Sequence, residues 1–190
     1  MGYDTNFTGH VTIEPPLNEH EITYLRDFSE TRRMNRTNGP YFVGGEGYAR
    51  QGCGSDEIFD RNAPHSSQPG LWCQWEPSED GTQISWNGTE KFYDSVEWMA
   101  YLIDSFLKPG AVVQQNLTVA KSADERFNHF TFDHTVNGII HAKGEDKDDT
   151  WDLVVNKNKV TRIDSTDLRA IESGDDSNII EGEVVQKSIC

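Results

Sequence analysis

The sequence predicts an α+β fold: a mainly antiparallel sheet with two amphipathic helices on one face, and a long loop insertion between the first helix and the central hairpin. Three observations support this class. Several short segments alternate apolar and polar residues between turn-forming residues. Two longer segments place apolar residues at helical spacing behind capping signals. The 190 residues suit one domain and contain no internal repeat.

The first strand and the first helix are predicted by adjoining signals. FTGHVTIE alternates apolar and polar residues, and two prolines close it. Asn18 can then cap a helix, and Glu21 three residues later can reach back to it, which is the pattern of a capping box. We expect this helix to include three arginines in its last part and to stop at Asn38–Gly39–Pro40.

The loop insertion spans Gly39 to Gly70, where glycine and proline are frequent and GPYFV is the only plausible strand. A loop of this length in a compact domain is either functional or disordered. It leads into LWCQWEPSEDGTQISW, which predicts a hairpin with SEDGT as its turn. YDSVEWMAYLIDSFL then predicts the second helix, with Asp94 as its cap and Pro109–Gly110 as its stop.

The C-terminal half predicts a meander of strands. Ala111 to Arg126 is interpreted as a connection. FNHFTFDHTVNGIIHAKGE predicts a hairpin that turns at Asn137–Gly138, and DTWDLVVNKNKVTRID a second that turns at Lys157–Asn158. We therefore place a single domain at 1–164, and we expect the acidic segment 165–190 to be a flexible tail.

Charge and composition restrict the class of partner. Thirty-two acidic residues against seventeen Lys and Arg give a formal charge of −15. Such a surface repels nucleic acid and acidic membranes, because phosphate contacts need Lys and Arg. No segment has the apolar length of a membrane span, and the N-terminus lacks the pattern of an export signal. The three scattered cysteines form no disulfide framework, so we expect a cytoplasmic protein.

Three segments of the chain resemble a family of uncharacterised proteins of actinobacteria and their phages. They are FTGHVTIEPPLNEHEITYLRDFSETRRMNRTNGPYFV, QPGLWCQWEPSEDGTQISW and EKFYDSVEWMAYLIDSFL. The resemblance extends to about Gly110 and, more loosely, includes VNGIIHAKGE. It implies no particular activity, but it favours an intracellular bacterial or phage setting and a role connected with phages or with defence.

The candidate site is the stretch RRMNRTNGPYFVGGEGYARQG, which combines arginines, aromatic residues and glycines. The helix dipole favours cations at a helix C-terminus, and this explains three of the arginines without any ligand. Arginine beside aromatic residues on a loop is also typical of stacking sites and of interface anchors. The candidate binding residues are Arg32, Arg33, Arg36, Tyr41, Phe42, Tyr48 and Arg50.

Signatures of catalysis and of cofactor binding are scarce, and no cofactor is predicted. GGEGYARQG has the glycines of a phosphate loop but lacks its Lys and Ser/Thr. His134 and His141, with Asp133 nearby, could approach each other across the expected Asn137–Gly138 turn and form a two-His, one-carboxylate metal site. Ordinary histidines on a sheet surface are the competing interpretation.

The leading hypothesis is an intracellular, non-enzymatic binding module that recognises a protein partner. Two alternatives stay open. One is a metal-dependent nucleotide or nucleic-acid hydrolase that uses His and Asp residues of the C-terminal hairpin. The other is an inhibitor whose acidic surface mimics DNA.

Overall fold

The framework is a six-stranded antiparallel sheet in the order β4-β5-β1-β6-β7-β8. The computed structural model describes residues 2–51, 57–119 and 125–165. The strands of the large sheet are β1 (Thr5–Glu14), β4 (Trp75–Pro77), β5 (Gln83–Trp86), β6 (Thr135–Gly144), β7 (Thr150–Asn156) and β8 (Lys159–Asp164). A second, two-stranded sheet pairs β2 (Met34–Arg36) with β3 (Ile58–Pro64).

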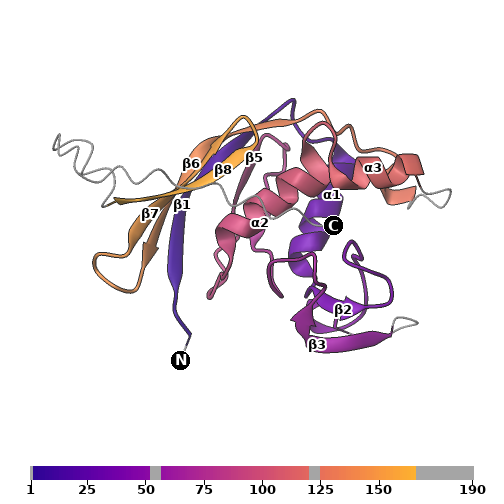
Figure 1. Cartoon of the computed structure of the whole chain (residues 1–190), viewed down its shortest axis with the longest axis horizontal. Coiled ribbons are helices and arrows are strands. Elements are labelled where there is room, and N and C mark those ends of the chain that lie inside the picture. The colour runs from indigo at the N-terminus through magenta and orange to yellow at the C-terminus, as the bar shows by residue number, and fades with distance from the viewer. Residues whose placement is uncertain (1, 52–56, 120–124, 166–190) are drawn as a thin grey trace.

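The helices are α1 (Glu19–Glu30), α2 (Ser95–Leu102) with a π turn that continues it (Ile103–Leu107), and α3 (Val112–Val119). Short 3-10 turns cover Tyr48–Arg50 and Glu125–Phe127. The helices α1 and α2 pack on the large sheet, and the β2–β3 pair lies beyond the C-terminal end of α1 (Figure 1). The predicted α+β class is therefore confirmed.

The core lies between the helices and the sheet and is rich in aromatic side chains. β7 alternates buried and half-buried residues, as expected of a strand with one covered face. The fully buried side chains with the largest volumes are Trp75, Trp98, Phe28 and Phe106. Many of the core rings meet edge to face, the geometry that aromatic pairs prefer.

The capping box at the start of α1 and the turn at Lys157–Asn158 are confirmed. The side chain of Asn18 accepts hydrogen bonds from the backbone N–H groups of His20 and Glu21, and the backbone N–H of Asn18 donates to Glu21 at 2.9 Å. Lys157 and Asn158 have φ values of 47° and 70°, which a tight hairpin turn requires at both central residues.

The expected turn at Asn137–Gly138 is wrong, because both residues lie inside β6. Every residue of β1 faces a residue of β6, from Thr5 opposite Gly144 to Glu14 opposite Thr135. Gly138 has φ 147°, and a Cβ there would lie 2.8 Å from Val11 Cα, so glycine permits a close approach of two strands. Pairing with β1 over its full length outweighs the local preference for a turn.

Other element boundaries also differ from the expectation. α1 ends at Glu30 rather than near Asn38, because Thr31 is extended and its hydroxyl donates to Asp27 O at 2.7 Å. The three arginines therefore follow the helix instead of ending it. GPYFV forms no strand; β3 pairs with β2 instead.

A third helix, α3, occupies part of the expected connection. Asp94 precedes α2, but its side chain makes no capping hydrogen bond.

Apart from Ser165, the expected acidic tail lies outside the described residues. No helix in the described part of the chain is both long enough and apolar enough to cross a membrane.

A buried pair of titratable side chains joins α1 to the segment before β6. Glu21 and His134 are both fully buried, with 3.2 Å between Glu21 Oε1 and His134 Nε2. The same carboxylate oxygen accepts the N–H of Thr131 at 2.7 Å, and His134 Nδ1 lies 2.7 Å from the carbonyl oxygen of Pro15. Since one ring nitrogen faces a carbonyl and the other a carboxylate, the doubly protonated ring fits this site.

The two pKa values move in opposite directions. Burial alone would lower the pKa of His134, but the hydrogen bond with Glu21 and that with Pro15 outweigh burial and raise it. Burial alone would raise the pKa of Glu21, but hydrogen bonds from His134, Thr131 and Asn18 outweigh burial and lower it. Folding therefore favours the charged form of both groups.

This pair predicts a stability maximum in weakly acidic solution. The contribution of His134 is complete below its ordinary pKa of 6.5 and is lost as pH rises through the higher folded-state pKa. That of Glu21 is complete above its ordinary pKa of 4.5 and is lost as pH falls through the lower folded-state pKa. We expect Glu21→Gln to lower the free energy of unfolding by about 3 kcal/mol at about pH 5.5, and by less at pH ~8 and pH ~3.5.

Urea denaturation of both proteins at the three pH values measures this difference. A penalty that is the same at all three pH values would show that the pair is not ionised in the folded protein.

Candidate functional site

Arg33, a candidate binding residue, is buried and holds the loop insertion against α1. Its guanidinium donates to the backbone carbonyl oxygens of Thr31 (2.9 Å), Phe42 (2.7 Å) and Pro40 (3.4 Å). It also lies over the ring of Phe28, 4.1 Å from the centroid. Burial lowers the pKa of Arg33 to about 10, so the group stays charged at neutral pH.

Arg36, Tyr41 and Phe42 are likewise held within the structure. Arg36 is buried, and its guanidinium lies over the Phe42 ring at 4.7 Å. Tyr41 is half-buried against the rings of Phe106 and Phe127, and burial raises the pKa of Tyr41. These three side chains fold the insertion onto the core instead of presenting a cationic face to solvent.

Arg50 and Arg32 fix the two sides of the glycine-rich loop. Arg50 forms ion pairs with Asp27 (2.5 Å) and Glu30 (3.1 Å) of α1. The backbone N–H of Arg32 donates to Ala49 O at 3.1 Å, and its guanidinium lies 5.6 Å from the centroid of the Trp72 ring. The arginines that were expected to form a binding surface are thus used mainly by the chain itself.

Tyr48 differs from the other candidate residues, because 87% of its surface is exposed. It begins the short turn Tyr48–Arg50, in which Ala49 and Arg50 adopt φ values of 51° and 54°. Such values are uncommon for residues other than glycine and persist only where surrounding contacts enforce them. A Cβ on Gly45 would lie 2.8 Å from Arg50 O, so glycine is needed for the loop to close.

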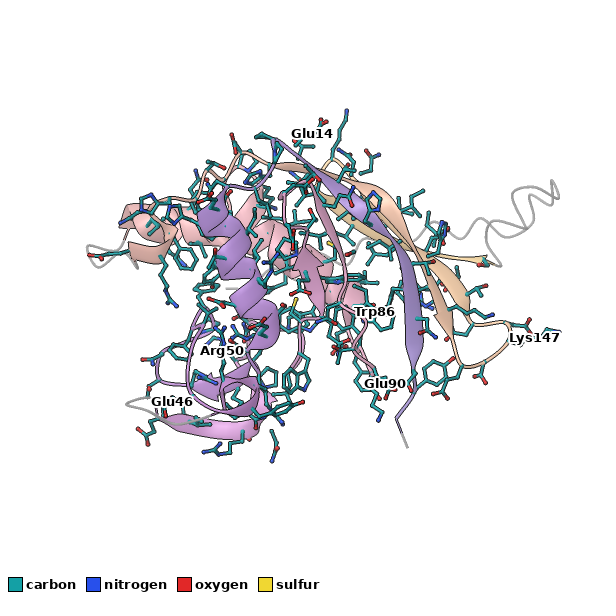
Figure 2. The ribbon with its side chains drawn as sticks, turned by 180° about the vertical axis from the view of Figure 1, so that it is seen from behind. Glu14, Glu46, Arg50, Trp86, Glu90 and Lys147 are labelled. Atoms are coloured by element: carbon teal, nitrogen blue, oxygen red, sulfur yellow. The ribbon has the colours of Figure 1, made fainter. Side chains whose placement is uncertain are left out.

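Two adjoining hollows of about 410 and 630 Å³ lie beside Tyr48. Both are lined by the same four residues, namely Tyr48, Trp72, Gln74 and Thr89, so we describe them together as the Tyr48 groove. The smaller hollow extends over Ser29, Glu30 and Arg50, and the larger over Pro64, Pro69, Leu71, Tyr93 and Asp94. Figure 2 shows Arg50 near the end of α1. It also shows Trp86 and Glu90, which belong to the end of β5 and the segment after it.

The floor of the Tyr48 groove is held by the buried side chain of Gln74. Its amide nitrogen donates to Glu90 O at 3.1 Å, and its amide oxygen accepts the indole N–H of Trp86 at 3.1 Å. The Trp86 indole also donates to Thr89 O, and the Asn87 N–H donates to Gln74 O. These bonds fix the segment after β5 as one wall, so the groove is formed before any ligand arrives.

Another wall of the larger hollow carries Tyr93 and several charged side chains. Tyr93 is 52% exposed. Its neighbours Lys91 and Asp94 have φ values of 61° and 55°, so this wall also has unusual backbone geometry. Burial, and then the nearby Glu97, raise the pKa of Asp94. An apolar hollow with a few polar groups at its edge has the usual composition of a binding site.

The two histidines proposed for a metal site do not meet. His134 is buried with Glu21, whereas His141 is exposed in β6 and lies 2.7 Å from Asp152 of β7. Because β6 runs straight through Asn137–Gly138, the expected approach across a turn is wrong. Within residues 2–51, 57–119 and 125–165, no three His, Cys, Asp or Glu side chains gather as a metal ion requires.

Cys73 is a free cysteine that packs in the core. The side chain is fully buried, and burial raises the pKa of its thiol to about 12. A thiol in this state is a poor nucleophile, because the thiolate is the reactive form.

Tyr48 was predicted from the sequence, but Trp72, Gln74 and Tyr93, which line the same groove, were not. These side chains come from three separate parts of the chain, and no local pattern joins them. The available signal was the density of aromatic residues from Tyr41 to Tyr93, which does not show which rings stay exposed.

Comparisons with protein-family models, with curated proteins and with solved structures find no match to this chain. The resemblance to a family of actinobacterial and phage proteins therefore stays a prediction.

The contacts of Arg33 predict that lysine cannot replace it. Arg33→Lys keeps the charge but loses the planar fork that reaches several carbonyl oxygens, and it leaves a desolvated ammonium. We expect a loss of about 3 kcal/mol in the free energy of unfolding, measured by urea denaturation. The exposed Arg61 offers a control, because Arg61→Lys should change this free energy by about 0.5 kcal/mol or less. Equal effects of the two substitutions would contradict the role given to Arg33.

Proposed function

We propose that the protein is an intracellular, non-enzymatic binding module that recognises another protein, and that a segment of this partner lies in the Tyr48 groove. The observation that carries the proposal is the exposed ring of Tyr48, which stands where the two hollows join. An exposed aromatic ring beside a preformed apolar hollow is the arrangement of an interface anchor. A role connected with phages or with defence belongs to the same proposal and rests on the sequence resemblance alone.

The composition of the groove indicates what kind of segment would fit. The rings of Tyr48, Trp72 and Tyr93, with two prolines and a leucine, offer apolar contact. Glu90 and Asp94 contribute carboxylates and Lys91 an amine, whereas Glu30 and Arg50 are paired with each other. The formal charge of −15 would also speed the approach of a basic protein. The partner segment should therefore be apolar in its centre and basic at its ends.

Removing the Tyr48 ring tests this function. We expect Tyr48→Ala to weaken the complex with the partner at least ~30-fold, since an anchor ring contributes about 2 kcal/mol or more. The partner would be captured from host lysate, identified by mass spectrometry, purified and titrated calorimetrically.

Phe59 supplies a matched control for this test. It is an exposed aromatic residue of β3, 63% accessible, and it does not line the groove. Phe59→Ala should leave the dissociation constant within about twofold. If both variants bind as tightly as the wild type, the Tyr48 groove is not the interface.

The alternatives from the sequence make different predictions in the same assays. A metal-dependent hydrolase would contain a divalent ion by elemental analysis and would gain thermal stability with that ion or with nucleotides. A DNA mimic would capture DNA-binding proteins, would release them in high salt, and would not depend on Tyr48.

A further inference from the structure

A third hollow, on another part of the surface, is lined by lysines. It measures about 540 Å³ and lies between the end of the α2 region and the β7–β8 turn. Three of its lining residues are Lys108, Lys157 and Lys159, and the only acidic one is Asp104. A concentration of positive charge is unexpected in a chain whose formal charge is −15. We call this place the lysine hollow.

Two of the three lysines have no counter-ion in the part of the chain that the structure describes. Lys108 pairs with Asp104 at 2.6 Å, which leaves no described carboxylate of the hollow for the others. Neither Lys157 nor Lys159 forms an ion pair with a described residue. The hollow therefore presents a net positive charge to whatever enters it.

The backbone that carries these lysines is held in place. The side chain of Asn158 accepts from Val136 N at 2.6 Å and donates to His134 O at 3.0 Å. The N–H of Lys157 donates to Asn137 Oδ1 at 2.7 Å. A turn fixed in this way positions its two lysines in advance, which lowers the entropy lost when an anion binds.

We propose that the segment Glu172–Glu183 of the same chain docks in the lysine hollow. This segment lies outside the described residues, and its sequence contains five acidic residues and no basic one. Its charge is therefore complementary to that of the hollow. Because the segment is tethered, its effective concentration at the hollow is high, and weak ion pairs suffice to hold it.

The chain is long enough for this return. β8 begins at the hollow with Lys159 and leads away from it to Asp164. At the usual rise per residue of a strand, this distance is about 17 Å. The eight residues from Asp164 to Glu172 can span about 28 Å when extended. The acidic segment can therefore reach back along the length of β8.

Lys143 provides a control based on proximity. It pairs with Thr150, and Asp164 pairs with the next residue, Trp151, so Lys143 lies at the end of the sheet where β8 stops. Lys147, which marks this end in Figure 2, follows in the next turn. A segment without a docking site would meet Lys143 more often than Lys159.

Carbodiimide cross-linking of the full-length protein, followed by mass spectrometry, tests the proposal because the reagent joins only carboxylates and amines in contact. We expect cross-links from Lys157 and Lys159 to the acids of Glu172–Glu183, with yields at Lys159 at least threefold above those at Lys143. Lys157→Ala should lower the Lys159 yield at least twofold, and Lys143→Ala should leave it unchanged. A mixture of isotope-labelled and unlabelled protein should give no mixed products.

Three results would overturn the proposal. The first is a higher yield at Lys143 than at Lys159. The second is no effect of Lys157→Ala on the Lys159 yield. The third is that the cross-links join labelled to unlabelled chains, which would place the acidic segment of a second copy in the hollow.

Discussion

The structure depends on how a long polar insertion is packed against an aromatic core without leaving its carbonyl groups unpaired. The buried guanidinium of Arg33 solves much of this problem, because one rigid group reaches three backbone oxygens and also stacks on Phe28. Buried polar groups that lack partners cost free energy, so removing this donor would release the insertion from α1. The position of Tyr48, and with it the groove, follows from this packing.

The same constraint explains why Arg33 and Arg36 are buried. In an acidic chain, a group of arginines beside aromatic residues is typical of a ligand site, and the helix dipole was the other explanation considered. Arg33 and Arg36 in fact lie in an extended segment after the helix, where they stack on Phe28 and Phe42. Arginine is suited to this use because its planar cation binds carbonyl oxygens at its edge and aromatic rings on its face.

Local signals predicted local features well. The capping box at Asn18, the turn at Lys157–Asn158 and the α+β class all follow from residues that are close in sequence. Features set by distant partners were missed. The straight path of β6 depends on its pairing with β1, and β3 forms by pairing with β2, which lies more than twenty residues earlier in the chain. The groove belongs to this second group, because its walls come from separate segments, whereas Tyr48 could be selected from its local setting.

The loop that carries Tyr48 has a consequence for how such a surface can diversify. Its anchors are Arg50, paired with α1, and Ala49, bonded to Arg32, whereas Glu46 and Tyr48 are exposed. Tyr48 lines the groove, so substitutions there would alter its rim and leave the anchors intact. Selectivity can therefore be retuned without destabilising the scaffold, as in other proteins that carry variable loops on a rigid frame.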